Sequence, residues 1–130
     1  MGESNKSNKR DKSDKGYHRL IVWQKAHEFV MLIYVKTREF PQAELYGLTS
    51  QLRRAAVSVA ANIIEGHAKT SKKEFLRYLG ISKGSLAECE YYLELATQLR
   101  FLNKEDYELL ENARGKVGYL LYQFIKHLRN

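Results

Sequence analysis

The sequence predicts an all-α protein, an antiparallel up-down-up-down four-helix bundle preceded by a disordered N-terminal tail. Apolar residues recur three and four positions apart over four long stretches, a spacing typical of amphipathic helices. The chain holds one proline, Pro41, so long helices are permitted. Short connections favour antiparallel neighbours. No strand-like alternation bounded by turn residues is present.

The predicted tail, residues 1–16, is almost entirely polar and lysine-rich, with five Lys or Arg residues and three Asp or Glu residues. Such a segment cannot bury enough apolar surface to offset the entropy lost on ordering, so we expect disorder. Residues 17–130 then form the four-helix bundle, a size ordinary for one domain.

The first two helices are predicted from about Leu20 to Glu39 and from about Leu48 to Glu65. The first ends at Phe40-Pro41, because the residue before a proline is disfavoured in the α region. Gly66 is expected to cap the second helix, since glycine adopts the left-handed conformation at little cost.

The third helix is predicted to begin at Ser71-Lys-Lys-Glu74, a capping box, and to continue to about Leu102. Gly80 and Gly84 interrupt it. Each interior glycine costs about 1 kcal/mol relative to alanine. The two glycines therefore predict a close approach by a neighbour, or a bend.

The fourth helix is predicted to follow Asn103, a good N-cap residue. Its apolar residues lie on more than one side, with Tyr119, Leu120, Tyr122 and Ile125 beyond the main stripe. One bundle core cannot absorb all of these, so we expect a subunit interface.

The stretch SVAANIIEG, residues 58–66, places polar side chains in a tightly packing helix. Ser58, Asn62 and Glu65 share roughly one side of it and, with Gly66, are predicted to form a structural lock. Asn62 is expected to bond a neighbouring helix. Glu65 is expected to fix the following turn through an arginine such as Arg53 or Arg54, of this chain or of a neighbouring subunit. A buried polar group must be satisfied, so it also penalises wrong registers.

Catalytic and metal-binding patterns are absent from the sequence. No two of the four histidines stand at metal-ligand spacing, and no phosphate-binding glycine loop or nucleophile with a general base is recognisable. The single cysteine, Cys89, excludes an intramolecular disulfide and is expected to be a small buried hydrophobe. We therefore expect no enzyme activity, no metal and no cofactor.

No apolar run approaches the ~20 residues that span a bilayer, and the N-terminus lacks the apolar core of a signal peptide. We expect no membrane association, and a cytoplasmic location.

The chain carries 22 Lys and Arg against 15 Asp and Glu, a formal charge of +7. This excess favours an anionic partner such as nucleic acid, although a lysine-rich soluble surface would give the same count. The candidate nucleic-acid-binding residues are Arg53, Arg54, Lys69, Lys72, Lys73 and Arg77. The two arginines could instead pair with acidic residues such as Glu88, Glu90 or Glu94. Six tyrosines could stack on unpaired bases or serve as core-edge and interface residues: Tyr78, Tyr91, Tyr92, Tyr107, Tyr119 and Tyr122.

Four segments carry a family resemblance: LIVWQKAHEFV, FPQAELYGLTSQLRRAAVSVAANIIEG, SKKEFLRYLGISKGSLAECEYYLELA and LNKED. From about Tyr17 to Leu128 the chain resembles the bacterial four-helix-bundle proteins encoded in intervening sequences of 23S ribosomal RNA genes. The resemblance implies a homopentamer. It also implies a distant relation to the accessory protein of diversity-generating retroelements, which assists a reverse transcriptase and is thought to bind nucleic acid through basic surface.

Two functional hypotheses follow. In the first, the chain is a non-enzymatic homo-oligomer that binds RNA or a ribonucleoprotein through its basic surface residues. In the second, it is an oligomeric protein-interaction scaffold with no nucleic-acid role.

Overall fold

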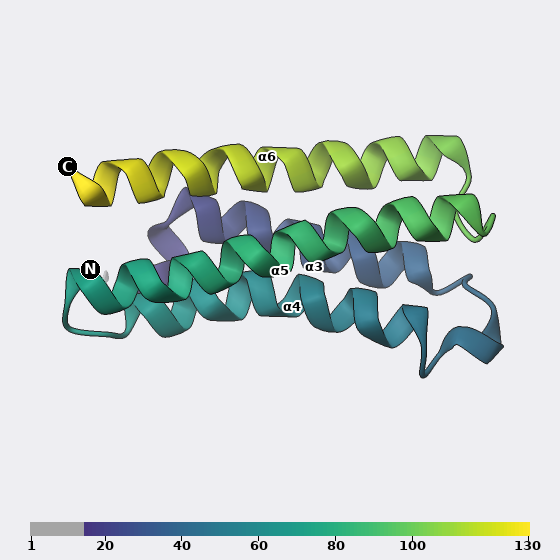
Figure 1. Cartoon of the computed structure of the whole chain (residues 1–130), viewed down its shortest axis with the longest axis horizontal. Coiled ribbons are helices and arrows are strands. Elements are labelled where there is room, and N and C mark those ends of the chain that lie inside the picture. The colour runs from purple at the N-terminus through teal and green to yellow at the C-terminus, as the bar shows by residue number, and fades with distance from the viewer. Residues whose placement is uncertain (1–14) are drawn as a thin grey trace, which may run out of the picture.

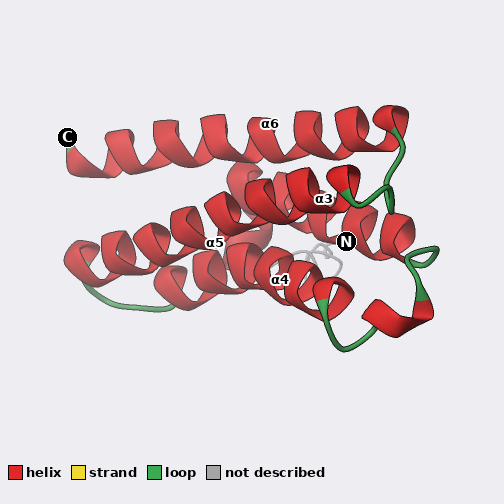
Figure 2. Cartoon of the chain, turned by 45° about the vertical axis from the view of Figure 1, so that its right-hand side comes forward, coloured by secondary structure: helices red, strands yellow, loops and turns green. Residues whose placement is uncertain are grey.

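The computed structural model describes residues 15–130, which form four long helices and two short 3₁₀ turns (Figure 1). Turn η1 (Gly16–Arg19) precedes helix α3 (Ile21–Thr37), and turn η2 (Gln42–Glu44) precedes α4 (Leu48–His67). Helices α5 (Lys72–Gln98) and α6 (Lys104–Arg129) complete the fold. Residues 15–130 contain no strand, which confirms the all-α prediction (Figure 2). The disorder expected of the tail falls, up to residue 14, outside the described residues.

Consecutive helices run in opposite directions (Figure 1). Contacts join α3 to α4, α4 to α5, α5 to α6, and α6 back to α3, so each helix has two neighbours around one core. The predicted apolar stripes fill that core, where burying one large apolar side chain contributes about 1.5–3 kcal/mol. The largest fully buried apolar side chains include Phe29, Ile33, Leu52, Ile63, Leu79, Leu93, Leu110 and Leu121.

Two helices begin at the capping residues that the sequence indicates. The Ser71 hydroxyl accepts a hydrogen bond from the Glu74 backbone N–H at 3.1 Å, and Asn103 Oδ1 accepts from the Asp106 N–H at 2.7 Å. The Glu74 carboxylate accepts a bond from Arg77 Nε at 3.3 Å. Each cap satisfies an amide that would otherwise lack an intrahelical partner.

Gly66 is not the cap of α4, so that prediction is wrong. The helix continues to His67, and its C-cap Ala68 has ordinary right-handed backbone angles. Gly66 is buried against α5, where an added Cβ would lie 2.8 Å from Phe75 Cδ1 and 2.9 Å from Tyr78 Cβ. This glycine is needed for the close approach of two helices, not for a backbone conformation.

Gly80 and Gly84 also differ from expectation. A Cβ at either position would meet no atom within 4 Å, and both residues are exposed. The close approach predicted at these glycines therefore does not occur at either one.

The left-handed backbone conformation expected at Gly66, at the end of α4, is found at the end of α5, at Arg100, the residue after the C-cap. Its φ is 67°, and its N–H donates to the Thr97 carbonyl at 3.0 Å. The next N–H, of Phe101, donates to the Ala96 carbonyl at 2.8 Å. This pair of bonds is the Schellman pattern, which usually has glycine where Arg100 stands.

Candidate nucleic-acid interface

The charge of the protein is concentrated in one half of the bundle. Dividing each helix at its midpoint gives a terminal half, residues 15–29, 58–85 and 117–130, which holds both described chain ends and the α4–α5 turn. The loop half, residues 30–57 and 86–116, holds the other two connections. The terminal half has ten Lys and Arg against three Asp and Glu, a formal +7, whereas the loop half has eight against nine, a formal −1.

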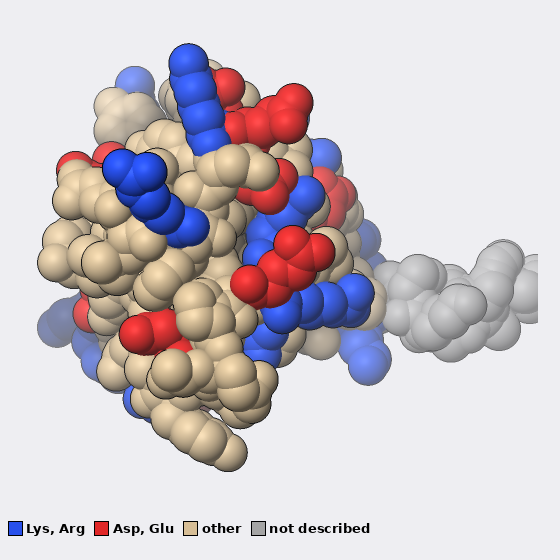
Figure 3. Space-filling view, turned by 90° about the vertical axis from the view of Figure 1, so that its right-hand side faces the viewer, with Lys and Arg blue, Asp and Glu red and all other residues tan. Residues whose placement is uncertain are grey.

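The cations of the terminal half come from α3, α5 and α6, from turn η1 and the residue before it, and from the α4–α5 connection, but not from α4 itself. They are Lys15, Arg19, Lys25, Lys69, Lys72, Lys73, Arg77, Lys83, Lys126 and Arg129. Figure 3 views the opposite end of the molecule, where basic and acidic side chains alternate. Because like charges are gathered in one half only, the protein has a positive end instead of a uniformly basic surface.

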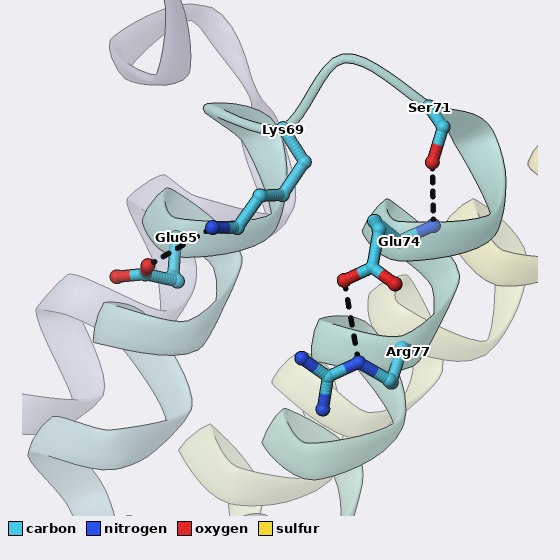
Figure 4. Close-up of polar contacts among 5 residues, drawn as sticks. All are labelled: Glu65, Lys69, Ser71, Glu74 and Arg77. Atoms are coloured by element: carbon cyan, nitrogen blue, oxygen red, sulfur yellow. Dashed lines mark hydrogen bonds and ion pairs between the residues drawn. The ribbon is translucent and has the colours of Figure 1, made fainter.

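Four of the six predicted binding residues, Lys69, Lys72, Lys73 and Arg77, lie in or just after the α4–α5 turn, and Figure 4 shows two of them, Lys69 and Arg77. Lys69 pairs with Glu65 at 3.6 Å, and Arg77 pairs with Glu74 at 3.3 Å, within one helical turn in each case. The bond with Glu74 raises the pKa of the Arg77 guanidinium. Exposed pairs of this kind contribute little stability, so a phosphate can replace the carboxylate at small cost.

Lys72 and Lys73 have no carboxylate partner within residues 15–130 and are exposed. The Tyr78 ring supports the two paired cations: Lys69 Nζ lies 5.3 Å and Arg77 Cζ 4.5 Å from its centroid. The turn therefore presents two cations over one aromatic ring and two further exposed lysines close by in sequence.

The structure places Arg53 and Arg54 elsewhere, in the loop half. At about 1.5 Å per residue, Arg53 lies about 21 Å along α4 from His67. Its Nε donates to Thr37 Oγ1 at 2.9 Å, and its guanidinium lies 4.7 Å from the Tyr34 ring centroid. Among the described residues neither arginine forms an ion pair, so the alternative of pairing with Glu88, Glu90 or Glu94 is not realised within this chain.

The predicted lock is made by different atoms from those expected. Asn62 Nδ2 donates to the carbonyl of Ser58, at 2.8 Å, and to its hydroxyl, at 2.9 Å, both within α4. The link to α5 comes from Ser58 itself, whose hydroxyl lies 2.8 Å from that of Ser85. Asn62 thus orients a serine that bridges the helices.

Ser82 provides a second bridge between the same two helices. It is fully buried, and its hydroxyl donates to the Val59 carbonyl at 2.7 Å. Glu65 pairs with Lys69 and not with Arg53 or Arg54 of the same chain. Ser82 and Ser85 were not predicted to bridge the helices, because small residues next to Gly80 and Gly84 do not show from the sequence alone which side of the helix is buried.

Sequence reasoning also missed a hollow between α5 and α6. It measures about 450 Å³ and is lined by Leu76, Gly80, Lys83, Tyr122, Ile125, Lys126, Arg129 and Asn130. No pattern within one helix signals it, because its lining comes from two helices whose relative rotation the sequence does not specify.

Residues 15–130 bring together no group of three or more His, Cys, Asp and Glu side chains able to hold a metal ion. Cys89 is buried, as expected, and burial raises the pKa of its thiol to about 12. At neutral pH the thiol is therefore protonated and a poor nucleophile. None of the helices in the described part of the chain is both long and apolar enough to span a membrane.

Comparison with protein families identifies the chain. Residues 18–123 match the family described as "23S rRNA-intervening sequence protein". The chain belongs to this family. The match covers all of α3, α4 and α5 and most of α6, so it includes the positive turn and the serine bridges.

A solved relative has the same fold. It is a crystal structure of a protein of unknown function from the S23 ribosomal protein family of Bacteroides thetaiotaomicron VPI-5482. The two share 27% identity with a TM-score of 0.75, over 82% of this chain and 96% of that chain. None of the curated proteins compared with this chain matches it.

Proposed function

We propose that this family member is a non-enzymatic, cytoplasmic RNA-binding protein, and that its terminal half is the binding surface. The observation that carries the proposal is the formal +7 of that half against −1 for the other. Lysine and arginine bind RNA mainly by neutralising phosphates, which needs a basic surface but no sequence-reading groove. The ribosomal RNA setting named by the family is consistent with a structured RNA or ribonucleoprotein as the partner.

The α4–α5 turn is the centre of the proposed surface. Lys72 and Lys73 are exposed and unpaired, while Lys69 and Arg77 exchange a weak carboxylate contact for a phosphate. Lys15, where the lysine-rich segment 1–14 joins the described chain, belongs to the same half, since the adjacent Gly16 lies against His67. Lys15 therefore lies at the same end of the bundle as the positive turn.

A filter-binding titration with ribosomal RNA fragments at two salt concentrations tests the proposal. With about six phosphate contacts, raising salt from about 50 to 200 mM lowers affinity about 1,000-fold. We expect micromolar or tighter binding at the lower salt and steep weakening at the higher. No retention of RNA at either concentration would refute it.

We further propose that the chain is a homo-oligomer, with five copies as the family resemblance implies. An exposed apolar patch in the loop half supports self-association, at a different place from the α6 residues Tyr119, Leu120, Tyr122 and Ile125 from which the sequence predicts an interface. It consists of Met31, Tyr34, Val35, Tyr46 and Val57, which are 40–93% exposed. Three of them line one shallow hollow with Arg53 and Arg54. Contiguous apolar surface rimmed by polar residues is typical of subunit contacts.

The same patch favours a second candidate function, a protein-interaction scaffold without RNA. Under that alternative, replacing Arg53 and Arg54 by glutamate would disrupt assembly, and no RNA would be recovered with the protein. Affinity capture from lysate with and without nuclease separates the two. Loss of bound material on nuclease treatment supports RNA binding, and unchanged protein partners support the scaffold.

A further inference from the structure

The hollow between α5 and α6 lies entirely within the terminal half, at the end of the bundle where the described chain finishes. Figure 1 shows α5 and α6 close together at their connecting loop and farther apart toward this end. At about 450 Å³ the hollow is within the range of small-ligand pockets. Gly80 contributes no side chain and has nothing within 4 Å of its Cβ position, which leaves the hollow open from the α5 side.

Three cations surround the hollow: Lys83 from α5, and Lys126 and Arg129 from α6. All three are exposed, and none has a carboxylate partner among residues 15–130. No Asp or Glu lines the hollow. Three positive side chains around an opening that has no Asp or Glu side chain favour an anionic ligand.

A neighbouring hollow of about 210 Å³ shares Lys83 and Tyr122 with the first but differs in charge. Its arginine, Arg114, accepts no further anion readily, because Nε bonds Glu111 at 2.8 Å and a second nitrogen lies 3.5 Å from Glu90. Of the two hollows, the first, which contains Lys126 and Arg129, therefore has the stronger positive potential.

The floor of the first hollow is apolar and aromatic. Leu76 and Ile125 are half-buried there, and Tyr122 is 57% exposed. A side chain ring that is open to solvent beside unpaired cations offers the two contacts a nucleotide needs, a stacking surface for the base and positive charge for the phosphate.

We propose that this hollow accepts one unpaired nucleotide of a bound RNA. Its base stacks on Tyr122 and its flanking phosphates contact Lys83, Lys126 and Arg129. The proposal rests on the RNA-binding function above and adds a preference for single-stranded segments, since a paired base cannot enter the hollow.

The test compares an eight-nucleotide single-stranded RNA with a duplex of matched phosphate number, using the full chain. Tyr122→Ala should lower single-strand affinity about tenfold or more and leave duplex affinity unchanged, because stacking acts only on an unpaired base. Tyr119→Ala is the matched control: Tyr119 is 63% exposed on the same helix but does not line the hollow.

Filling the hollow without changing charge gives an independent readout. Gly80→Leu should abolish the preference for the single strand, whereas Gly84→Leu, at an equally open position outside the hollow, should not. Circular dichroism confirms that each variant is folded.

The outcomes distinguish the two proposals. Absence of binding to both RNAs refutes the RNA-binding function itself. Duplex binding with equal losses for Tyr122→Ala and Tyr119→Ala overturns the nucleotide site alone. Displacement of the single strand by a glutamate-rich peptide, with duplex binding retained and the same dependence on Tyr122, assigns the hollow to an acidic protein segment and also overturns it.

Discussion

In the terminal half of the bundle, ten lysine and arginine side chains accompany three carboxylates, and several of the cations have no partner. In the loop half, eight accompany nine, and three of the eight are held by a neighbouring hydroxyl or carboxylate. Arg53 bonds Thr37 there, Lys36 pairs with Asp106 at 3.0 Å, and Arg114 is bonded to Glu111.

The difference separates two uses of the same residue types. A cation held by a neighbouring hydroxyl or carboxylate orders the fold, and a cation left in solvent is available to a ligand. Sequence counts do not distinguish the two, because partners are set by helix packing. The proposed roles follow from this separation, with RNA binding in the terminal half and self-association in the loop half.

The largest expected effect is on RNA affinity. Replacing Lys69, Lys72 and Lys73 by glutamate should weaken RNA binding on the order of 100-fold at about 100 mM salt and reduce the salt dependence, because phosphate contacts are lost. The matched control replaces Arg38, Arg100 and Lys104 in the loop half with the same charge change. Equal losses of RNA affinity for the two triple variants, measured by filter binding, would contradict the claim that RNA binds the terminal half in preference to the loop half.

The next effect is on assembly. Val57→Asp should dissociate the oligomer to the 15.2 kDa protomer, because it places a charge in the apolar patch. Ile81→Asp, at 41% exposure on α5 against 40% for Val57, is the control and should leave the oligomer intact. Light scattering after size-exclusion chromatography measures both. If Val57→Asp remains an oligomer, the subunit interface does not include this patch.

A smaller effect is expected on stability at the α4–α5 contact. Gly66→Ala should cost about 1–3 kcal/mol of unfolding free energy, because the new methyl group overlaps Phe75 and Tyr78. Gly84→Ala, with nothing within 4 Å, should instead stabilise by about 0.5–1 kcal/mol through helix propensity. Urea unfolding measures both free energies. Changes of the same sign would contradict the claim that Gly66 packs against a neighbouring helix and Gly84 does not.

The smallest effect is at the helix end of the loop half. Arg100→Gly should stabilise the protein by about 1 kcal/mol, because glycine adopts a φ of 67° without the Cβ penalty. Arg100→Ala removes the same charge and should give no such gain. A thermal melt in which the two variants coincide would attribute any change to charge and not to the backbone.

The fold was predictable from the sequence because it depends on local signals. Helical spacing of apolar residues, Ser71 and Asn103 as caps, and Phe40-Pro41 as a stop each act within a few residues. The roles of the glycines were not predictable in this way. Whether Gly66 or Gly84 lies against a neighbour depends on helix rotation, which the sequence of one helix does not specify.

The candidate site was predictable in part for the same reason. Lys69, Lys72, Lys73 and Arg77 are close in sequence, so their grouping at one turn follows directly. The prediction that Arg53 and Arg54 belong to the same surface is not met, because most of the length of α4 separates them from the turn. The hollow around Tyr122 is lined by residues of α5 and α6 that lie far apart in the sequence, so no pattern within one helix reveals it.

The most direct test of the central claim is to locate bound RNA by ultraviolet cross-linking and mass spectrometry of the full chain. The account predicts cross-linked peptides from residues 58–85 and 117–130, including the α4–α5 turn. Cross-links concentrated in residues 30–57 and 86–116, or spread evenly over both halves, would contradict it.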